Sequence, residues 1–93
     1  MQPANFEFRR RDGGVIYQYH YDGERNGKPT WKRSDLDLWC VWLEDSGWAI
    51  IDAQGTQLSW PQEKPEALVA LPPASLWVSK KGDKSYIYEL VYR

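Results

Sequence analysis

His20 is the only histidine in the chain and therefore the first candidate for acid–base chemistry. It stands between Tyr19 and Tyr21 in an alternating segment, where we expect it to face solvent on a strand. A general base needs an oriented partner and a nucleophile within reach. The sequence pairs no such residue with His20, so we predict that the protein is not an enzyme.

Cys40 is the only cysteine and lies inside the apolar run 38–43. A reactive thiol needs a cationic, partly exposed setting, and no basic residue is adjacent, so a buried core thiol is expected. One histidine and one cysteine are too few for a structural zinc site, and we predict no metal and no cofactor. The absence of a disulfide framework in so small a domain favours a reducing compartment.

The acidic residues could in principle form a carboxylate pair or a calcium site. The loop Ser34–Leu38 contains Asp35 and Asp37, but it lacks the glycine and the terminal glutamate of an EF-hand loop. We therefore interpret these side chains as solvated turn carboxylates. Gly13-Gly14 and Gly82 are interpreted as hairpin glycines rather than phosphate cradles, because neither precedes a helix.

Arg9-Arg10-Arg11 is the one local run of charge. Three arginines beside exposed tyrosines could clamp single-stranded nucleic acid. The net charge of −1 gives no long-range attraction for phosphate or anionic lipid, so nucleic-acid binding is kept only as an alternative. Protection of an edge strand is the preferred interpretation.

The chain has six Trp, six Tyr and two Phe in 93 residues, more rings than its core needs. Trp39, Trp42 and Trp48 are expected in the core. The other three Trp lie near turns or strand ends, where full burial is harder, and three Tyr form a stripe on one face of segment 15–21. Since Trp and Tyr often anchor binding sites, the candidate ligand-binding residues are Tyr17, Tyr19, Tyr21, Trp31, Trp60 and Trp77.

Glycine-containing turns divide the chain into short alternating or apolar segments. Segment 15–21 alternates strictly, and Asn26-Gly27 is typical of a tight hairpin. Asp22-Gly23 is read as a further turn. Segment 38–43 is apolar on both faces and is expected to be the most buried, central strand. The sequence predicts an all-β fold of about seven short antiparallel strands in a meander, small barrel or rolled sheet.

The proline-rich segment 61–73 interrupts this pattern and excludes a central strand there. Residues 65–70 could form one short helical turn with Pro65 at its first position. No linker divides the chain, so residues 1–93 are expected to form a single domain. The first eight residues lack a secretory signal and no apolar run reaches the ~18 residues of a membrane span. A soluble, cytoplasmic protein is expected.

Several short motifs lie in a recognisable order, and they are Asn26-Gly27-Lys28-Pro29-Thr30-Trp31-Lys32, Leu38-Trp39-Cys40-Val41-Trp42, Gly47-Trp48-Ala49-Ile50, Gly55, and Pro72-Pro73 with Trp77. Together they resemble a Trp-rich β module that is common in protist and algal proteins. The resemblance covers about residues 15–90. It implies an interaction or scaffold module without a known catalytic role.

A second resemblance is to WW domains, which grip a polyproline II ligand with an aromatic pair. Trp39 and Trp60 are 21 residues apart, and Pro61 follows Trp60. The apolar segment 49–51 stands where such domains carry an aromatic strand, and extra strands flank both sides. The resemblance implies that Trp60 faces the ligand and Trp39 is structural.

We therefore expect a non-catalytic module that binds protein or peptide through an exposed aromatic face. Edge strands would also permit self-association by strand pairing. The alternatives are carbohydrate or small-ligand binding by Trp stacking, and binding of single-stranded nucleic acid. No membrane partner is expected.

Overall fold

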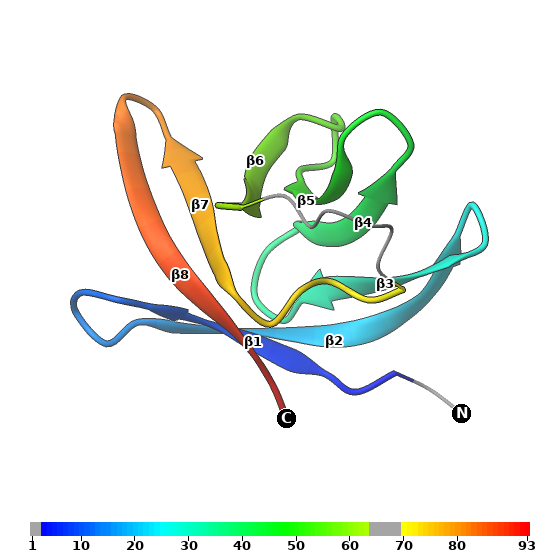
Figure 1. Cartoon of the computed structure of the whole chain (residues 1–93), viewed down its shortest axis with the longest axis horizontal. Coiled ribbons are helices and arrows are strands. Elements are labelled where there is room, and N and C mark those ends of the chain that lie inside the picture. Colours follow the sequence, from blue (N-terminus) through cyan, green and yellow to red (C-terminus); the bar gives the residue numbers. More distant parts are fainter. Residues whose placement is uncertain (1–2, 64–69) are drawn as a thin grey trace.

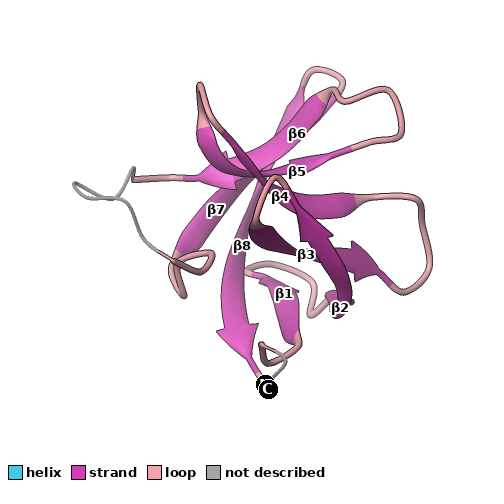
Figure 2. Ribbon diagram, turned by 90° about the vertical axis from the view of Figure 1, so that its right-hand side faces the viewer, coloured by secondary structure: helices cyan, strands magenta, loops and turns pink. Residues whose placement is uncertain are grey.

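The computed structural model describes residues 3–63 and 70–93, and this part of the chain is all-β with no helix (Figure 2). Its eight strands follow one another as an antiparallel meander that closes into a small barrel (Figure 1). The predicted fold class is confirmed, with eight strands where about seven were expected. The strands are β1 (Phe6–Arg10), β2 (Ile16–Arg25), β3 (Lys28–Arg33), β4 (Trp39–Leu43), β5 (Gly47–Ile51), β6 (Gln57–Pro61), β7 (Leu76–Lys81) and β8 (Lys84–Tyr92).

The barrel closes where the first and last strands pair. Phe6 lies opposite Tyr92 and Phe8 lies opposite Leu90 in the β1–β8 ladder, and the amide of Arg93 donates to the carbonyl of Asn5 at 2.9 Å. Every described strand therefore has a neighbour on both sides. The edge strand expected at Arg9-Arg10-Arg11 does not exist, because β8 returns to cover it.

The β2–β3 hairpin turns at Asn26-Gly27, as the sequence predicts. The two residues have φ angles of 54° and 77°, the conformation of a type I′ turn, whose twist matches that of the flanking strands. Arg25 and Lys28 pair directly across this turn.

The prediction of a turn at Asp22-Gly23 is wrong, because these residues form a β-bulge inside β2. The pairing with β3 shifts register between Tyr21 and Glu24, and Gly23 supplies a φ of 87°. The hydroxyl of Thr30 lies 3.1 Å from both the Asp22 and the Gly23 carbonyls, to which it can donate. The bulge bends the strand without ending it.

The interior of the barrel is filled mainly by rings. Side chains alternate between the two faces of each strand, and an eight-stranded barrel is just wide enough for its inner side chains to fill it. The buried cluster consists of Phe6, Phe8, Tyr19, Trp31, Cys40, Trp48, Ile50, Trp77, Tyr88 and Leu90.

The most buried of the middle strands is β5 and not β4, which corrects the prediction for segment 38–43. Four of the five β5 residues are buried, but only Cys40 and Val41 are buried in β4. Trp39 shares the outer face with Ile51, while Trp42 lies at one end of the interior beside Trp48. Both β4 indoles therefore stay half-buried.

Residues 65–69 of the helical turn predicted at 65–70 lie outside the described residues. Within the described ranges, no helical segment has the length and apolar character needed to cross a bilayer.

Candidate functional site at the open end of the barrel

The two ends of the barrel differ in what fills them. One end, here called the closed end, is defined by Trp31, Trp48, Trp77 and Tyr92. Indole Nε1 of Trp31 donates to the Ala4 carbonyl at 3.0 Å, and that of Trp77 donates to the Pro73 carbonyl at 3.1 Å. These bonds satisfy the indole N–H groups and let the rings be buried.

This arrangement corrects the exposure expected for two candidate ligand-binding residues. Trp31 and Trp77 are both 0% exposed, so neither ring can contact a ligand in this structure. The N-terminal segment and residues 72–73 reach the two rings from distant parts of the sequence. Trp60, the third Trp candidate, is half-buried.

The tyrosine stripe does share one face of β2, but that face is the interior. Tyr19 is 2% exposed, and Tyr17 and Tyr21 are half-buried against the core. The opposite face carries Ile16, which is 51% exposed, and the exposed His20. The expectation of a solvent-exposed tyrosine face is wrong, because closure of the barrel turns this side of β2 toward the interior.

The other end, here called the open end, is defined by Tyr17, Arg33, Ser59, Ser79 and Lys81. A cavity of about 50 Å³ opens here. In Figure 1 the β1–β2 and β7–β8 hairpins project on this side of the barrel, away from the labelled chain ends. The described residues that line the cavity are Phe8, Tyr17, Tyr19, Arg33, Leu38, Ile50, Leu58, Ser59, Ser79, Lys80, Lys81 and Tyr88.

Two facing serines leave the space for this cavity. Ser59 and Ser79 pair directly in the β6–β7 ladder, and Ser59 also pairs with Ile50. The next pair along the same face toward the closed end is Pro61 with Trp77. A pair of small side chains thus takes the place of an indole, and the barrel interior remains unfilled at this end.

Arg33 is the charged group nearest to the interior. Its guanidinium stacks on the Tyr17 ring at 3.5 Å from the ring centroid. Its Nε and Nη2 donate to the two carboxylate oxygens of Asp35 at 2.6 and 3.1 Å. The Arg33 side chain is only 9% exposed, whereas that of Asp35 is 58% exposed.

The Arg33–Asp35 pair keeps both groups charged. The hydrogen bond from Arg33 lowers the pKa of the Asp35 carboxyl. Burial opposes the charge on Arg33, but the hydrogen bond and charge of Asp35, together with Tyr19 and Tyr17, raise the Arg33 pKa. The positive group at the open end is therefore permanent.

A second guanidinium stacks nearby, on the last residues of β1. Arg10 lies 4.4 Å from the centroid of the Tyr86 ring, and Arg10 pairs with Tyr88 in the β1–β8 ladder. Asp12 accepts a hydrogen bond from Arg10 at 3.0 Å, which is the main cause of the raised pKa of Arg10. Burial and the neighbouring Tyr17 raise the pKa of Tyr88.

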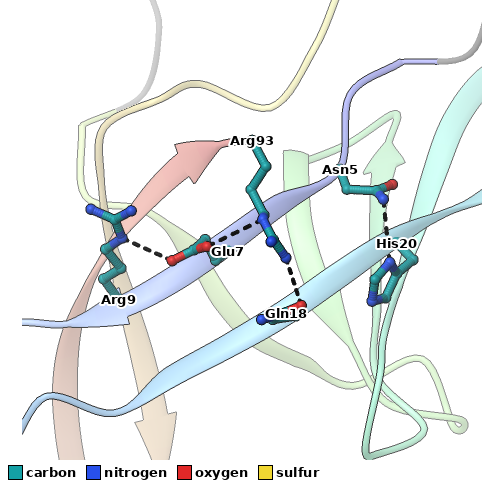
Figure 3. Close-up of polar contacts among 6 residues, drawn as sticks. All are labelled: Asn5, Glu7, Arg9, Gln18, His20 and Arg93. Carbon is teal, nitrogen blue, oxygen red and sulfur yellow. Dashed lines mark hydrogen bonds and ion pairs between the residues drawn. The ribbon is translucent and has the colours of Figure 1, made fainter.

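The remaining polar network lies on the outer face of β1 and β2 (Figure 3). Glu7 is paired with Arg9 at 2.9 Å and with Arg93 at 3.5 Å, and Arg93 donates to Gln18. His20 lies 3.3 Å from the side-chain amide of Asn5. These contacts tie the chain ends to the barrel wall, and they join no described cavity.

The other sequence candidates have structural partners as well. Burial raises the pKa of the Cys40 thiol well above its ordinary value, as expected for a core thiol. Asp37 pairs with Lys32, and Asp52 accepts the amides of Gln54 and Thr56 in a turn. In residues 3–63 and 70–93, no group of three His, Cys, Asp or Glu side chains could hold a metal ion.

Tyr17 and Tyr19 are the predicted ligand-binding residues that line the cavity, whereas Arg33, Ser59, Ser79 and Lys81 were not predicted. One signal was present in the alternation of β7, where Ser79 and Lys81 occupy inward positions after Trp77. Polar residues at inward positions of a strand indicate a gap in the core or a site. The pairing with Ser59 and the approach of Arg33 depend on barrel closure and have no local signal.

Comparison of the chain with protein-family models, with curated proteins and with solved structures found no match. The resemblances to the Trp-rich β module and to WW domains therefore stay predictions.

Proposed function

We propose that this chain is a non-catalytic binding module that receives a peptide segment of a partner protein at the open end of the barrel. One observation carries the proposal. The cavity between the Ser59–Ser79 pair and the Arg33–Tyr17 stack combines aromatic, hydroxyl and cationic groups in one opening. Ligand sites commonly occupy the mouths of β-barrels.

The size of the cavity favours a peptide over a free small molecule. Pockets that enclose a small-molecule ligand usually have volumes of ~300–1,000 Å³, and this one has about 50 Å³. It can take the tip of one side chain or a chain terminus, while the rest of the ligand stays outside. A peptide anchored by one group has this form.

An exposed apolar side chain between two cavity-lining residues supplies further contact area. Leu36 is 49% exposed in the short loop between Arg33 and Leu38. Anchoring groups surrounded by smaller apolar contacts are the usual composition of a peptide-binding surface.

Carbohydrate binding by Trp stacking has less support. A sugar needs an accessible ring face, but Trp31, Trp48 and Trp77 are buried. Lys28 and Lys32 lie over the half-buried rings of Trp42 and Trp39. The role of the aromatic residues is therefore assigned mainly to the core.

An array of random peptides probed with the folded protein tests the proposal. Ser79→Leu should fill the cavity and abolish binding of the selected peptides, because Ser79 lines the opening and is only half-buried. Glu89→Leu is the matched control, because Glu89 is exposed and lies outside the cavity lining. A thermal melt of each variant verifies the fold. The proposal is wrong if peptides bind Ser79→Leu as well as the parent protein.

A further inference from the structure

We infer that the group received at the open end is a carboxylate, from either an acidic side chain or a peptide C-terminus. This inference rests on the proposed function and names the chemistry of the ligand. The first reason is the charge of the cavity wall. Its charged members among the described residues are Arg33, Lys80 and Lys81, and all three are cations.

The second reason is that the lysines of this wall have no counter-ion. In this wall Arg33 holds a carboxylate within 3.5 Å, as do Arg9, Arg10, Lys32 and Arg93 elsewhere. Lys80 and Lys81 form no ion pair with any described residue. No ion pair with a described residue is formed by Arg11, Arg25, Lys28 and Lys84 either. Lys81 also lies directly opposite Lys84 in the β7–β8 ladder, and like charges in that position repel. An anion beside Lys81 would relieve this repulsion.

The third reason is a supply of unused hydrogen-bond donors. Ser59 is 3% exposed, yet its hydroxyl, like that of Ser79, has no hydrogen-bond partner among the described residues. Both side chains line the cavity. No fully buried side-chain N or O atom of the described residues lacks a partner, so the Ser59 hydroxyl keeps contact with solvent, which a ligand oxygen in the cavity can replace.

Arg33 completes the donor set. Its Nε and Nη2 are used by Asp35, but no described residue accepts from Nη1. The Tyr17 ring holds the guanidinium plane in place. Hydroxyl, ammonium and guanidinium donors around one small opening are complementary to the oxygens of a carboxylate.

A nucleic-acid ligand is less favoured by the same observations. A single strand is bound by a charged groove that follows many phosphates, while this site offers one opening of about 50 Å³. The chain as a whole has a net charge of −1. A single small anionic group fits the opening better than a polyanion.

Backbone-amide NMR titrations with sodium acetate and with acetamide test the inference without a known peptide. Acetate should shift the resonances of Ser59, Ser79 and Lys81 at concentrations where acetamide leaves them unchanged. Lys81→Gln should lower the affinity for acetate about fivefold, which is the effect expected from the loss of one partly exposed charge. Arg25→Gln makes the same change of charge at an exposed position in the β2–β3 hairpin and should have no effect.

The peptide array separates this inference from the proposed function. Selected peptides should lose binding when their carboxylates are amidated, and comparison of side-chain with C-terminal amides tells the two sources apart. If peptides bind but acetate shifts nothing and amidated peptides bind equally well, the carboxylate inference is overturned and the binding module stands. If acetate binds but no peptide does, the proposed function fails instead. Tighter binding of an oligo-dT strand than of any acidic peptide would also overturn the inference.

Discussion

The closed and open ends of this barrel are built from the same eight strands but from different side chains. At the closed end, Trp31 packs against Phe6 and Trp48 with ring centroids 5.4 and 6.0 Å apart. Backbone carbonyls accept hydrogen bonds from the buried indole N–H groups of Trp31 and Trp77. At the open end, Ser59 faces Ser79 and leaves a cavity.

Under the proposed function, this difference separates the residues that stabilise the fold from those that contact the ligand. Large buried rings supply most of the free energy of folding in a small domain. The unpaired lysines and the serine hydroxyls of the open end add little to that free energy. Substitutions at the closed end should therefore change stability, and substitutions at the open end should change binding.

The largest expected effect is at the closed end. Trp31→Ala should lower the free energy of unfolding by about 3–5 kcal/mol, because it leaves a large cavity in the core and an unpaired Ala4 carbonyl. Urea unfolding followed by far-UV circular dichroism measures this loss. Trp60→Ala, at a half-buried ring on the outer face, should cost less than half as much. Equal losses for the two variants would contradict the importance assigned to the closed end.

The next largest loss of stability is expected at alkaline pH, where the tyrosines of the aromatic interior ionise. Burial raises the pKa values of Tyr19, Tyr88 and Tyr92 above the ordinary value of 10.0. The native state therefore holds these protons more tightly than the unfolded state does, and stability is complete below pH 10 and decreases above it. We expect a loss of about 1 kcal/mol per pH unit for each fully buried tyrosine.

Urea unfolding at a series of pH values from 9 upward, with tyrosinate absorbance in parallel, measures this decrease. Tyr92→Phe is the control, since it removes one of the three groups and should make the decrease shallower. A free energy of unfolding that stays constant across this range would refute the assignment of these tyrosines to the interior.

A smaller loss of stability is expected at the boundary between the core and the cavity. Arg33→Met keeps the apolar stem but removes the stack on Tyr17 and the paired hydrogen bonds to Asp35. The cost should be about 1 kcal/mol, because Asp35 is mostly exposed and solvent screens the pair. Asp35→Asn should cost less than this in the same urea experiment. A loss of unfolding free energy as large as that of Trp31→Ala would mean that the open end also stabilises the fold.

The smallest change in stability is expected at the cavity itself. Ser79→Ala removes a hydroxyl that has no protein partner among the described residues. Its free energy of unfolding in urea should therefore change by about 0.5 kcal/mol or less, as for neutral surface substitutions. Its acetate response in the NMR titration should nevertheless be weaker than that of the parent protein. A large loss of stability would show that this hydroxyl is structural.

Local features of the fold could be predicted well because they depend on neighbouring residues. The Asn26-Gly27 turn follows from the backbone freedom of those two residues, and the sharing of a face by Tyr17, Tyr19 and Tyr21 follows from strand alternation. The bulge at Asp22-Gly23 was mistaken for a turn, since the same glycine conformation serves both. The continued pairing of β2 with β3 on both sides and the Thr30 contacts distinguish them.

Burial of individual rings could not be predicted in the same way. Trp77 is next to a proline-rich segment and Trp31 follows a hairpin, which suggested exposure, yet carbonyls from Pro73 and Ala4 cover their indoles. Trp42 sits in an apolar run, which suggested burial, yet it lies at an end of the barrel and stays half-buried. Each outcome depends on which distant segment reaches the ring.

The sequence by itself determined the strands, the main hairpins and which side chains share a face, because these follow from local backbone preferences and from alternation. Only the tertiary structure decided which face became the interior, and it alone brought Ser59, Ser79, Arg33 and Lys81 to one opening. The physical reason is closure of the sheet. The pairing of β1 with β8 fixes the register around the whole barrel, and that register sets which residues from distant strands meet at each end.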